Sequence, residues 1–335
     1  MDKIRVLLTK RYFQEDISYL RRNLVESVEL IQPAGFTSEA IAQAARDDVH
    51  VLLGDHVAKE TLDNAKGLRL IQIPWTGVDR LDFELLNKYP VVVCNSHSNA
   101  GIVAEYAVGL MMAIVKKIPF HDKQLRLGKW MRPRKNSTDS FFPPDVIAGK
   151  TIGFVGYGAI ARKITQLLSG FGVSFMAVDA RQTAPPPEPL QFLGAPNQAA
   201  YVMAQSDIVF VAVPLTAKTA GMINGDLLKR MKPSAYLINI SRGEVVNESD
   251  LYDTLKERLI AGAAVDTWFD YPTEACPDTL PSTYPFHELD NLVLSPHRAG
   301  FAGGLLPHLD DAIENINRLA TGRPLVNCVN PNDGF

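Results

Sequence analysis

The stretch Thr151–Asp179, TIGFVGYGAIARKITQLLSGFGVSFMAVD, decides the fold class of this chain. An apolar run, Ile152–Val155, predicts a buried strand, and the glycine-rich segment Gly156–Ala161 follows it directly. Apolar residues three and four positions apart then predict a helix, and a second apolar run, Phe175–Val178, ends on Asp179. This order of strand, glycine turn, helix, strand and acidic residue is typical of a dinucleotide-binding unit.

The residue types in this stretch fit the chemistry of a bound dinucleotide. Gly156 allows a tight turn, and Gly158 lets backbone N–H groups approach a pyrophosphate at the N-terminus of the helix. Ala161 stands where a third glycine is common, and alanine still permits close packing of helix on strand. Asp179 can accept both hydroxyls of an adenosine ribose, which favours NAD. Arg181 leaves NADP open, because an arginine nearby could attract a 2′-phosphate.

Length, charge and cysteine content limit the classes of protein to consider. The 335 residues suggest about two domains, and the net charge of −3 comes without a block of basic residues. We therefore expect no nucleic-acid partner and no attachment to a membrane surface. The three cysteines are an odd and sparse number, which predicts a reducing cytoplasm, and they lack metal-ligand spacing, so no metal site is expected. No apolar run approaches the ~20 residues of a membrane span.

The rest of the chain alternates strands with helices. Short strands and helices over residues 4–94 predict a first parallel sheet, without a phosphate-binding glycine pattern. Gly101–Lys117 predicts a helix that is apolar almost all round, so it is buried between domains or in a subunit contact. Further strands are predicted to end near residues 213, 240, 265 and 295. The fold class is therefore α/β, with doubly wound parallel sheets in two domains.

Chemically active residues follow several of these strands. Pro214 and Asp266 come directly after apolar runs, and Arg242 and His297 follow such runs after Ser241 and after Ser295-Pro296. Ligands of open α/β sheets bind beyond the carboxyl ends of the strands, so these residues are expected to gather there. Arginine can bind a carboxylate and polarise a carbonyl, and histidine can transfer a proton near neutral pH. Taken alone, however, such an arginine or histidine is more often a surface or structural residue.

A set of segments resembles the D-isomer-specific 2-hydroxyacid dehydrogenase family. The segments are Gly156–Ala161, Val213–Thr216 with Thr219, Met231–Gly243, Ala261–Asp266 and Ser295–His297, and the similarity runs from about Leu70 to Val326. The resemblance implies a flavodoxin-like substrate (catalytic) domain of residues 1–98 and 301–335. A Rossmann domain of residues 99–300 would bind NAD, with the active site in a cleft between the domains. It also implies a homodimer, with the helix after Asn99 at the interface.

The resemblance also assigns roles to residues. Arg242 would hold the carboxylate and carbonyl of a small-molecule substrate, and His297 would be the acid/base. Thr76 and Gly77 would give backbone N–H groups to the carboxylate, and Asn99 would line the site. The expected cofactor-binding residues are Gly156, Gly158, Ala159, Ile160, Asp179, Pro214, Thr219, Ile240, Ser241, Asp266 and Gly300. The implied reaction is hydride transfer between NAD(H) and a 2-ketoacid/D-2-hydroxyacid pair.

Tyr271 departs from the family pattern at a catalytic position. The family usually has a glutamate there, which hydrogen-bonds the histidine, whereas this chain has Tyr271 before Pro272. The surrounding segment looks like the formate dehydrogenase branch, which carries glutamine. A neutral partner can orient an imidazole but gives little electrostatic support to imidazolium, so we predict that His297 is less easily protonated. Glu274 could support His297 instead.

Two other functions remain open from the sequence. Loss of the usual glutamate would suit a protein that senses NAD(H) without turnover, although such a sensor has no need of both Arg242 and His297. An NAD enzyme acting on a non-ketoacid such as formate is the other alternative. The sequence names neither the particular acid nor the direction of the reaction.

Overall fold

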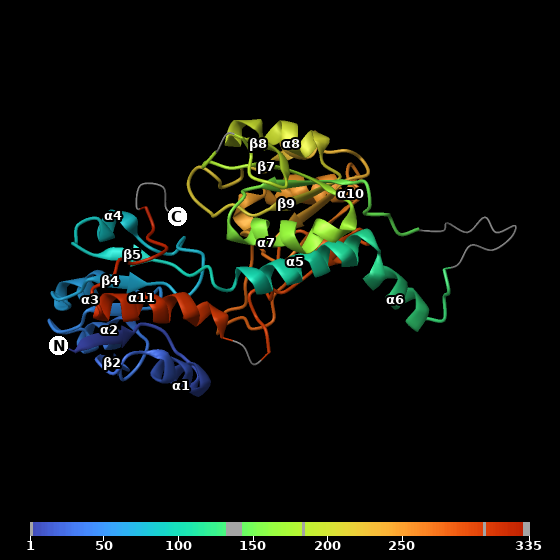
Figure 1. Ribbon diagram of the computed structural model, residues 1–335. Coiled ribbons are helices and arrows are strands. Elements are labelled where there is room, and N and C mark those ends of the chain that lie inside the picture. The colour runs from blue at the N-terminus through green and yellow to red at the C-terminus, as the bar shows by residue number, and fades with distance from the viewer. Residues whose placement is uncertain (1–2, 132–142, 183–184, 304–305, 331–335) are drawn as a thin grey trace, which may run out of the picture. The chain divides into compact units, whose positions relative to one another are not determined.

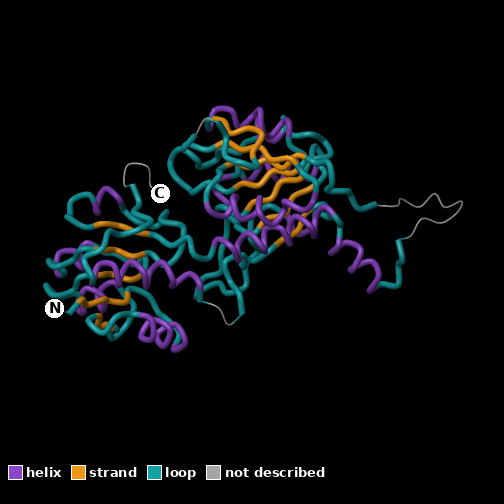
Figure 2. The backbone as a smooth tube through the Cα atoms, in the orientation of Figure 1, coloured by secondary structure: helices purple, strands orange, loops and turns teal. Residues whose placement is uncertain are grey.

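A computed structural model describes residues 3–131, 143–182, 185–303 and 306–330 of the chain. The chain forms two compact units, each of which is a parallel sheet with helices on its faces (Figures 1 and 2). Unit 1 consists of Met1–Asn99 together with Ala302–Phe335, and unit 2 consists of Ala100–Phe301. The predicted α/β class with doubly wound parallel sheets is confirmed.

Unit 1 contains a five-stranded sheet with the strand order β2-β1-β3-β4-β5, which is the flavodoxin-like order. Its strands are Ile4–Leu8 (β1), Val28–Ile31 (β2), Val51–Leu53 (β3), Leu70–Gln72 (β4) and Val92–Cys94 (β5). Its helices are Gln14–Asn23 (α1), Ser38–Ala44 (α2), Lys59–Asn64 (α3), Phe83–Leu86 (α4) and Asp310–Ala320 (α11). Because α11 follows unit 2 in the chain, both ends of the sequence contribute to this unit.

The two faces of the unit 1 sheet have separate cores. Successive side chains of a strand point to opposite faces, so neighbours such as Val6 and Leu7 enter different cores. Leu7 and Ile71 pack with residues of α2 and α3. Val6 and Cys94 pack instead with residues of α1 and α11. Burial of each large aliphatic side chain contributes about 1.5–3 kcal/mol, so α11 is an integral part of the unit.

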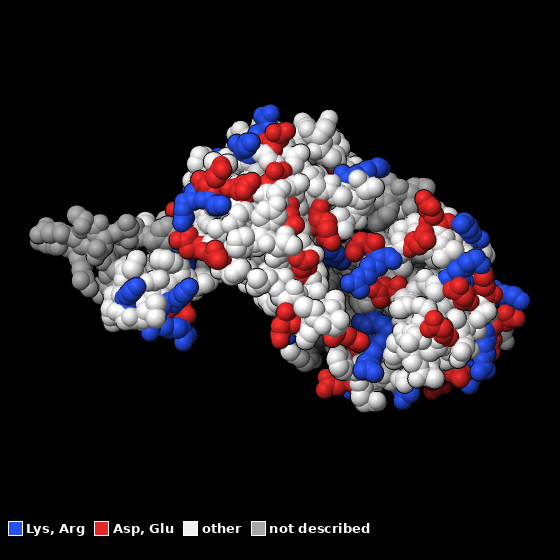
Figure 3. Space-filling model, turned by 180° about the vertical axis from the view of Figure 1, so that it is seen from behind, with Lys and Arg blue, Asp and Glu red and all other residues white. Residues whose placement is uncertain are grey.

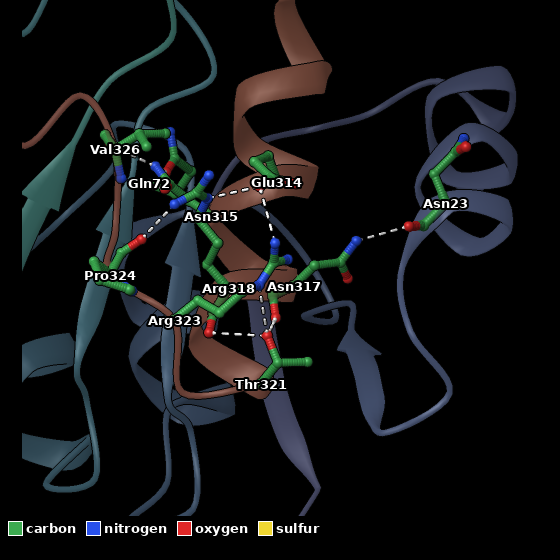
Figure 4. A network of polar contacts seen from close by, with 10 residues as sticks. All are labelled: Asn23, Gln72, Glu314, Asn315, Asn317, Arg318, Thr321, Arg323, Pro324 and Val326. Carbon is green, nitrogen blue, oxygen red and sulfur yellow. Dashed lines mark hydrogen bonds and ion pairs between the residues drawn. The ribbon is translucent and has the colours of Figure 1, made fainter.

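Asn315 joins α11 to the sheet and to the C-terminal segment (Figure 4). Its side-chain nitrogen donates to Oε1 of Gln72 at 2.8 Å and to the carbonyl oxygen of Val326 at 2.9 Å. Its Oδ1 accepts the N–H of Val326 at 2.8 Å. Arg318 on the same helix donates to the carbonyl oxygen of Pro324 at 2.8 Å. Buried polar groups are costly unless they are paired, so these contacts fix the path of the chain after α11.

Unit 2 contains a seven-stranded parallel sheet with the order β12-β11-β10-β9-β6-β7-β8. The strands are Thr151–Val155 (β6), Ser174–Val178 (β7), Leu190–Gly194 (β8), Ile208–Val211 (β9), Tyr236–Asn239 (β10), Gly262–Val265 (β11) and Leu292–Leu294 (β12). The helices are Ala100–Val115 (α5), Ile118–Arg126 (α6), Ala159–Leu168 (α7), Ala199–Gln205 (α8), Gly225–Leu228 (α9) and Glu248–Lys256 (α10). The strands β7 and β8 are added on one side of β6, and the strands β9 to β12 are added on the other side. Rossmann domains bind dinucleotides at the point between β6 and β9 where this order switches.

Helices cover both faces of the unit 2 sheet. The helices α5 and α7 lie side by side on one face (Figure 1) and pack on Phe154 and Phe210, whose rings stack at 5.5 Å. The helices α8, α9 and α10 pack on the other face, against residues such as Val209 and Leu237. Because both faces are covered, the strands are almost wholly apolar and the polar residues collect at their ends.

The surface shows no single-sign patch in the view from behind. Lysine and arginine side chains are interspersed with aspartate and glutamate side chains on the face drawn in Figure 3. No helix in the described part of the chain has the length and hydropathy needed to cross a membrane. Among the described residues, no group of three or more histidine, cysteine, aspartate or glutamate side chains is placed to hold a metal ion.

Candidate active site

The glycine turn after β6 has the shape that a bound pyrophosphate requires. Gly156 has a φ of 92°, and a Cβ there would lie 2.6 Å from the carbonyl oxygen of Ala212. A side chain is therefore excluded both by backbone strain and by contact. Gly158 is the N-cap of α7 and provides no side-chain cap, and a Cβ there would meet no described atom within 4 Å. The first N–H groups of α7, from Ala159 and Ile160, are therefore available to phosphate oxygens.

Asp179 follows β7 and contacts the glycine turn. Its Oδ2 accepts the N–H of Tyr157 at 2.8 Å, and its Oδ1 accepts the N–H of Arg181 at 2.8 Å. Each oxygen keeps a further lone pair, with which it can accept a ribose hydroxyl. The guanidinium Nε of Arg181 lies 3.5 Å from Oδ1. Asp179, which favours NAD, and Arg181, which could admit NADP, are therefore in direct contact.

Two hydroxyl groups shape the loop after β9, and one of them joins this loop to the end of β10. Thr219 Oγ1 donates to the carbonyl oxygen of Pro214 at 2.6 Å and accepts the N–H of Thr216 at 2.8 Å, which closes the loop after β9. Ser241 Oγ donates to the carbonyl oxygen of Val213 at 2.7 Å, which joins the end of β10 to that loop. Three of the predicted cofactor-binding residues thus form one connected surface at the carboxyl edge of the sheet.

Arg242 is positioned by contacts of its backbone and of its neighbours. The buried side chain of Asn239 donates to the carbonyl oxygen of Arg242 at 3.1 Å and accepts the N–H of Ser241 at 3.1 Å. A Cβ on Gly243 would lie 2.3 Å from the carbonyl oxygen of Trp268, so glycine lets the loop after β10 approach the loop after β11. The guanidinium of Arg242 is half-buried, and its Nη1 donates to the carbonyl oxygen of Ser241 at 2.9 Å.

Asp266 anchors the loop that carries His297. Its buried carboxylate accepts hydrogen bonds from the hydroxyl of Ser295, from the N–H of Arg298 at 2.9 Å and from the N–H of Ala299 at 3.1 Å. His297 has a φ of 54°. A non-glycine residue in this conformation costs about 1–3 kcal/mol and persists only where its surroundings enforce it. The contacts of Asp266 supply that enforcement, and its expected role in cofactor binding remains a prediction.

Tyr271 is in hydrogen-bonding contact with His297. Its Oη lies 3.0 Å from Nδ1 of His297 and accepts the N–H of Trp268 at 3.1 Å. With one lone pair taken by Trp268, the hydroxyl can donate its proton to Nδ1 or accept a proton from it, so it can orient the imidazole in either protonation state. Burial raises the pKa of Tyr271, against the opposing effects of the Trp268 hydrogen bond and the charge of Arg242. The phenol is therefore neutral near pH 7. Glu274, the other candidate support, is an exposed residue of the same loop.

In unit 1, the turn after β4 holds the residues expected to bind the substrate. Thr76 Oγ1 donates to the carbonyl oxygen of Ser96 at 3.0 Å, and Asn95 donates to the carbonyl oxygen of Thr76 at 2.7 Å. No described residue accepts a hydrogen bond from the N–H of Thr76 or Gly77, so both remain available to a carboxylate. The Oδ1 of Asn99 is buried without a hydrogen-bond partner in the described part of the chain, which costs about 1–3 kcal/mol unless a ligand donor meets it.

Comparison with known proteins identifies the family. A family model described as the NAD-binding domain of D-isomer-specific 2-hydroxyacid dehydrogenases matches residues 108–299. This chain belongs to that family. A glyoxylate reductase from Thermofilum pendens is 35% identical over 260 residues, which are 76% of this chain and 72% of that protein. A D-3-phosphoglycerate dehydrogenase from Archaeoglobus fulgidus is 29% identical over 98% of this chain, but the matched region spans 59% of its length. The solved PH0520 protein from Pyrococcus horikoshii has a TM-score of 0.79 at 27% identity, covering 98% of this chain and 95% of that one.

Membership of the 2-hydroxyacid dehydrogenase family confirms the predicted class of reaction. The protein is an oxidoreductase that transfers a hydride between NAD(P)(H) and a 2-ketoacid/D-2-hydroxyacid pair. Its Rossmann unit binds the dinucleotide. Solved structures of the same fold at 22–24% identity include one complex with NADPH and one with NADP, so the fold alone does not decide between NAD and NADP.

Several residues that shape this dehydrogenase site were not predicted from the sequence. Asn95, Asn239 and Ser295 each position a loop through side-chain hydrogen bonds. Their only signal in the sequence is a polar residue at or just after the end of an apolar strand. Of the predicted cofactor-binding residues, Ile240 packs into the core of unit 2, whereas Gly300 is half-exposed in the loop after β12.

Proposed function

We propose that Arg242 binds the carboxylate of the substrate and polarises its carbonyl, and that His297 transfers the proton. One observation carries this proposal: both residues act on Tyr271. Its Oη lies 3.0 Å from Nδ1 of His297, and the positive charge of Arg242 opposes the rise that burial causes in its pKa. Arg242 and His297 also follow the strands β10 and β12 of one sheet at its carboxyl edge, on either side of β11, which supports a shared site for the guanidinium and the imidazole. This is the pair of groups that reduction of a ketoacid needs.

Arg242, His297 and Tyr271 have separate roles in the proposed reaction. The bound nicotinamide supplies or accepts the hydride. As negative charge develops on the carbonyl oxygen, Arg242 stabilises it and Nε2 of His297 donates a proton to it. In the direction of oxidation, the neutral imidazole carries its proton on Nδ1, which donates to Oη of Tyr271, so that the lone pair of Nε2 accepts the hydroxyl proton. Tyr271 is a positioning residue, because it orients the imidazole through Nδ1 without touching the substrate.

We further propose that unit 1 contributes substrate contacts through Thr76, Gly77 and Asn99. The N–H groups of the Thr76–Gly77 turn suit a carboxylate, and the buried Oδ1 of Asn99 suits a donor on the ligand. These contacts would bind any 2-ketoacid, so they set the class of the substrate and leave the size of its side chain to other residues.

We propose NAD as the preferred cofactor. The carboxylate of Asp179 suits the two ribose hydroxyls of NAD and repels the 2′-phosphate of NADP. Arg181 weakens this preference, because it pairs with the same carboxylate. The remaining predicted contacts, from Gly156 to Gly300, follow the carboxyl ends of the strands on both sides of the switch point between β6 and β9.

We also propose that the enzyme is a cytoplasmic homodimer. None of the residues of α6 is buried, and Ile118, Leu125, Leu127 and Trp130 are exposed apolar side chains on this helix and the segment after it. Figure 1 shows α6 extending away from the sheet of unit 2. An apolar surface of this kind is typical of an interface between subunits. Light scattering tests the dimer: Leu125→Asp with Leu127→Asp should give a monomer of normal secondary structure. The cysteines, all free thiols, suit a reducing compartment.

A substrate panel tests the catalytic proposal. The purified protein is mixed with NADH or NADPH and with glyoxylate, hydroxypyruvate, pyruvate or a bulkier 2-ketoacid, and the loss of absorbance of the reduced cofactor is followed. We expect turnover that falls by about 10²–10³-fold in kcat/KM for Arg242→Ala. Arg230→Ala, which removes an exposed arginine elsewhere on unit 2, is the matched control and should be unchanged.

The same panel separates the alternatives. Tight binding of NADH without turnover of any acid would identify a sensor and overturn the catalytic proposal. Reduction of NAD by formate, with no activity on ketoacids, would place the protein with the non-ketoacid enzymes. Membership of the dehydrogenase family favours turnover of a ketoacid over both.

A further inference from the structure

Two cysteines far apart in the sequence lie on paired segments of unit 1. Cys94 is the last residue of β5, and Cys328 lies in the segment that follows α11. They form an antiparallel bridge. The flanking hydrogen bonds run from the N–H of Asn95 to the carbonyl of Asn327 at 3.1 Å and from the N–H of Val329 to the carbonyl of Val93 at 2.9 Å. Because these bonds flank the two cysteines, Cys94 and Cys328 form a non-hydrogen-bonded pair, in which facing side chains come closest.

The geometry of this pair suits a disulfide. The Cα atoms of non-hydrogen-bonded pairs are about 4.5 Å apart, within the range that a disulfide spans. The two Sγ atoms are 3.5 Å apart, and both residues are free thiols. A disulfide needs about 2.05 Å between the sulfurs. Side-chain rotation with a small backbone adjustment can supply the difference, so no element has to unfold.

The segment that carries Cys328 is held in place on both sides of the pair. Before the pair, Val326 makes two hydrogen bonds with Asn315 of α11 (Figure 4). The side chain of Asn327 donates to Asp311 of the same helix at 3.0 Å. After the pair, Val329 is bonded to β5 and is buried in the core. The two thiols are therefore neighbours because of the fold, and not through chance contact of a loose chain end.

We propose that Cys94 and Cys328 are a thiol pair that closes to an intrachain disulfide on reaction with a low-molecular-weight disulfide. Cys328 is exposed and meets the oxidant first, whereas Cys94 is buried. The thiolate of Cys328 attacks one sulfur of RSSR, forms a mixed disulfide and releases RS⁻. Cys94 then loses its proton to water and attacks Sγ of Cys328, which releases a second RS⁻. The two cysteines are oxidised, and RSSR is reduced to two RSH.

The different environments of the two thiols explain this order. Burial and the neighbouring Cys328 raise the pKa of Cys94, so this residue remains a thiol while the protein is reduced. A buried thiol of raised pKa resists oxidants from solution but reacts with a mixed disulfide formed beside it. The bond would join residues 234 positions apart and would fasten the C-terminal segment to β5.

The test uses the full-length protein and oxidised glutathione. After incubation, free thiols are alkylated, and the intact mass and the proteolytic peptides are measured. We expect Cys94 and Cys328 to escape alkylation together and to appear as one cross-linked peptide, while the exposed Cys276 is alkylated or carries glutathione. The cross-linked protein should show a melting temperature about 5–10 °C higher for unit 1, and dithiothreitol should reverse the shift.

Matched variants make the outcome decisive. Cys276→Ser should form the cross-link as the natural chain does. Cys328→Ser, at an exposed position, should leave Cys94 reduced and abolish the shift in melting temperature. A stable mixed disulfide on Cys328 with Cys94 still alkylatable after unfolding would overturn the proposal, as would disulfides only between molecules. Neither outcome depends on whether the protein reduces ketoacids, because the measurement follows thiols and stability alone.

Discussion

Replacement of Tyr271 by glutamate should widen the pH range of ketoacid reduction. The phenol Oη lies 3.0 Å from Nδ1 of His297. A glutamate is shorter, so its carboxylate would lie about 4–5 Å from the imidazole. At that distance two unit charges interact with about 4 kcal/mol at an effective dielectric constant of 20. Tyr271 is 44% exposed, so solvent screening reduces this to about 2 kcal/mol. One pH unit corresponds to 1.36 kcal/mol, so the expected displacement is about 1–1.5 pH units.

The sign of the displacement follows from the charge. A carboxylate favours imidazolium, so His297 would hold its proton to a higher pH, and reduction, which needs that proton, would persist further into the alkaline range. Oxidation of the hydroxyacid needs neutral imidazole, so its acidic limit should move upward as well. The assay is kcat/KM against pH between about 5.5 and 10, in both directions, with cofactor saturating.

Two further variants separate charge from orientation. Tyr271→Phe removes the hydroxyl and keeps the ring, so kcat should fall by about 10-fold while the alkaline limit stays near that of the natural protein. Tyr271→Gln restores a neutral hydrogen-bonding group and should recover part of the rate without moving the limit. If Tyr271→Glu is active and its alkaline limit coincides with that of the natural protein, His297 is not the titrating acid or Tyr271 does not contact it during turnover. Either finding would refute the reasoning.

Three other substitutions test the cofactor site and the fold. Gly156→Ala should abolish binding of NADH in a fluorescence titration, because its Cβ would lie 2.6 Å from the carbonyl of Ala212 at a φ of 92°. Asp179→Asn should raise the ratio of kcat/KM for NADPH to that for NADH by about 10–100-fold, since repulsion of the 2′-phosphate is lost. Tyr236→Phe should lower the free energy of unfolding by about 1 kcal/mol at pH 7.5, because its hydroxyl donates to Asp145. Burial raises the pKa of Tyr236, so the native state keeps a proton that the unfolded state releases above pH ~10. In urea melts between pH 8 and 11, the free energy of unfolding of the natural protein should therefore fall as the pH passes ~10. The free energy of unfolding of Tyr236→Phe should fall less over the same range.

The glycine turn and its acidic residue were predictable because they belong to one short stretch. Gly156 and Asp179 end consecutive strands that pair with each other, so spacing along the chain is enough to place them together. The edge strand Leu190–Gly194 was not predicted, since it directly follows a run of prolines that indicates an extended loop. The pairing of Cys94 with Cys328 could not be predicted either. It depends on α11 returning to the first sheet, which no local pattern encodes.

The site residues also differ in how far their roles could be predicted from the sequence. Residue type and position after a strand made Arg242 and His297 candidates, but their proposed roles came from the family resemblance, because such a residue taken alone is more often a surface or structural one. The contact of Tyr271 with His297 was expected from the family resemblance, whereas the partners of Asp266 depend on which groups it meets in three dimensions. Asp266 was predicted to serve the cofactor, yet its carboxylate already accepts three hydrogen bonds from the loop that holds His297. The sequence shows which chemical group each position carries. It does not show which hydrogen-bonding partner that group has in the folded protein.

The contacts of His297 explain how this dehydrogenase can lack the usual glutamate. The backbone of His297 is strained, with a φ of 54°, and the buried carboxylate of Asp266 enforces that conformation. The hydroxyl of Tyr271 then fixes the rotation of the ring through Nδ1. Orientation is thus provided by the backbone and by a neutral hydrogen bond. A carboxylate would add chiefly stabilisation of imidazolium, so Tyr271 should limit the pH range of reduction far more than the maximal rate.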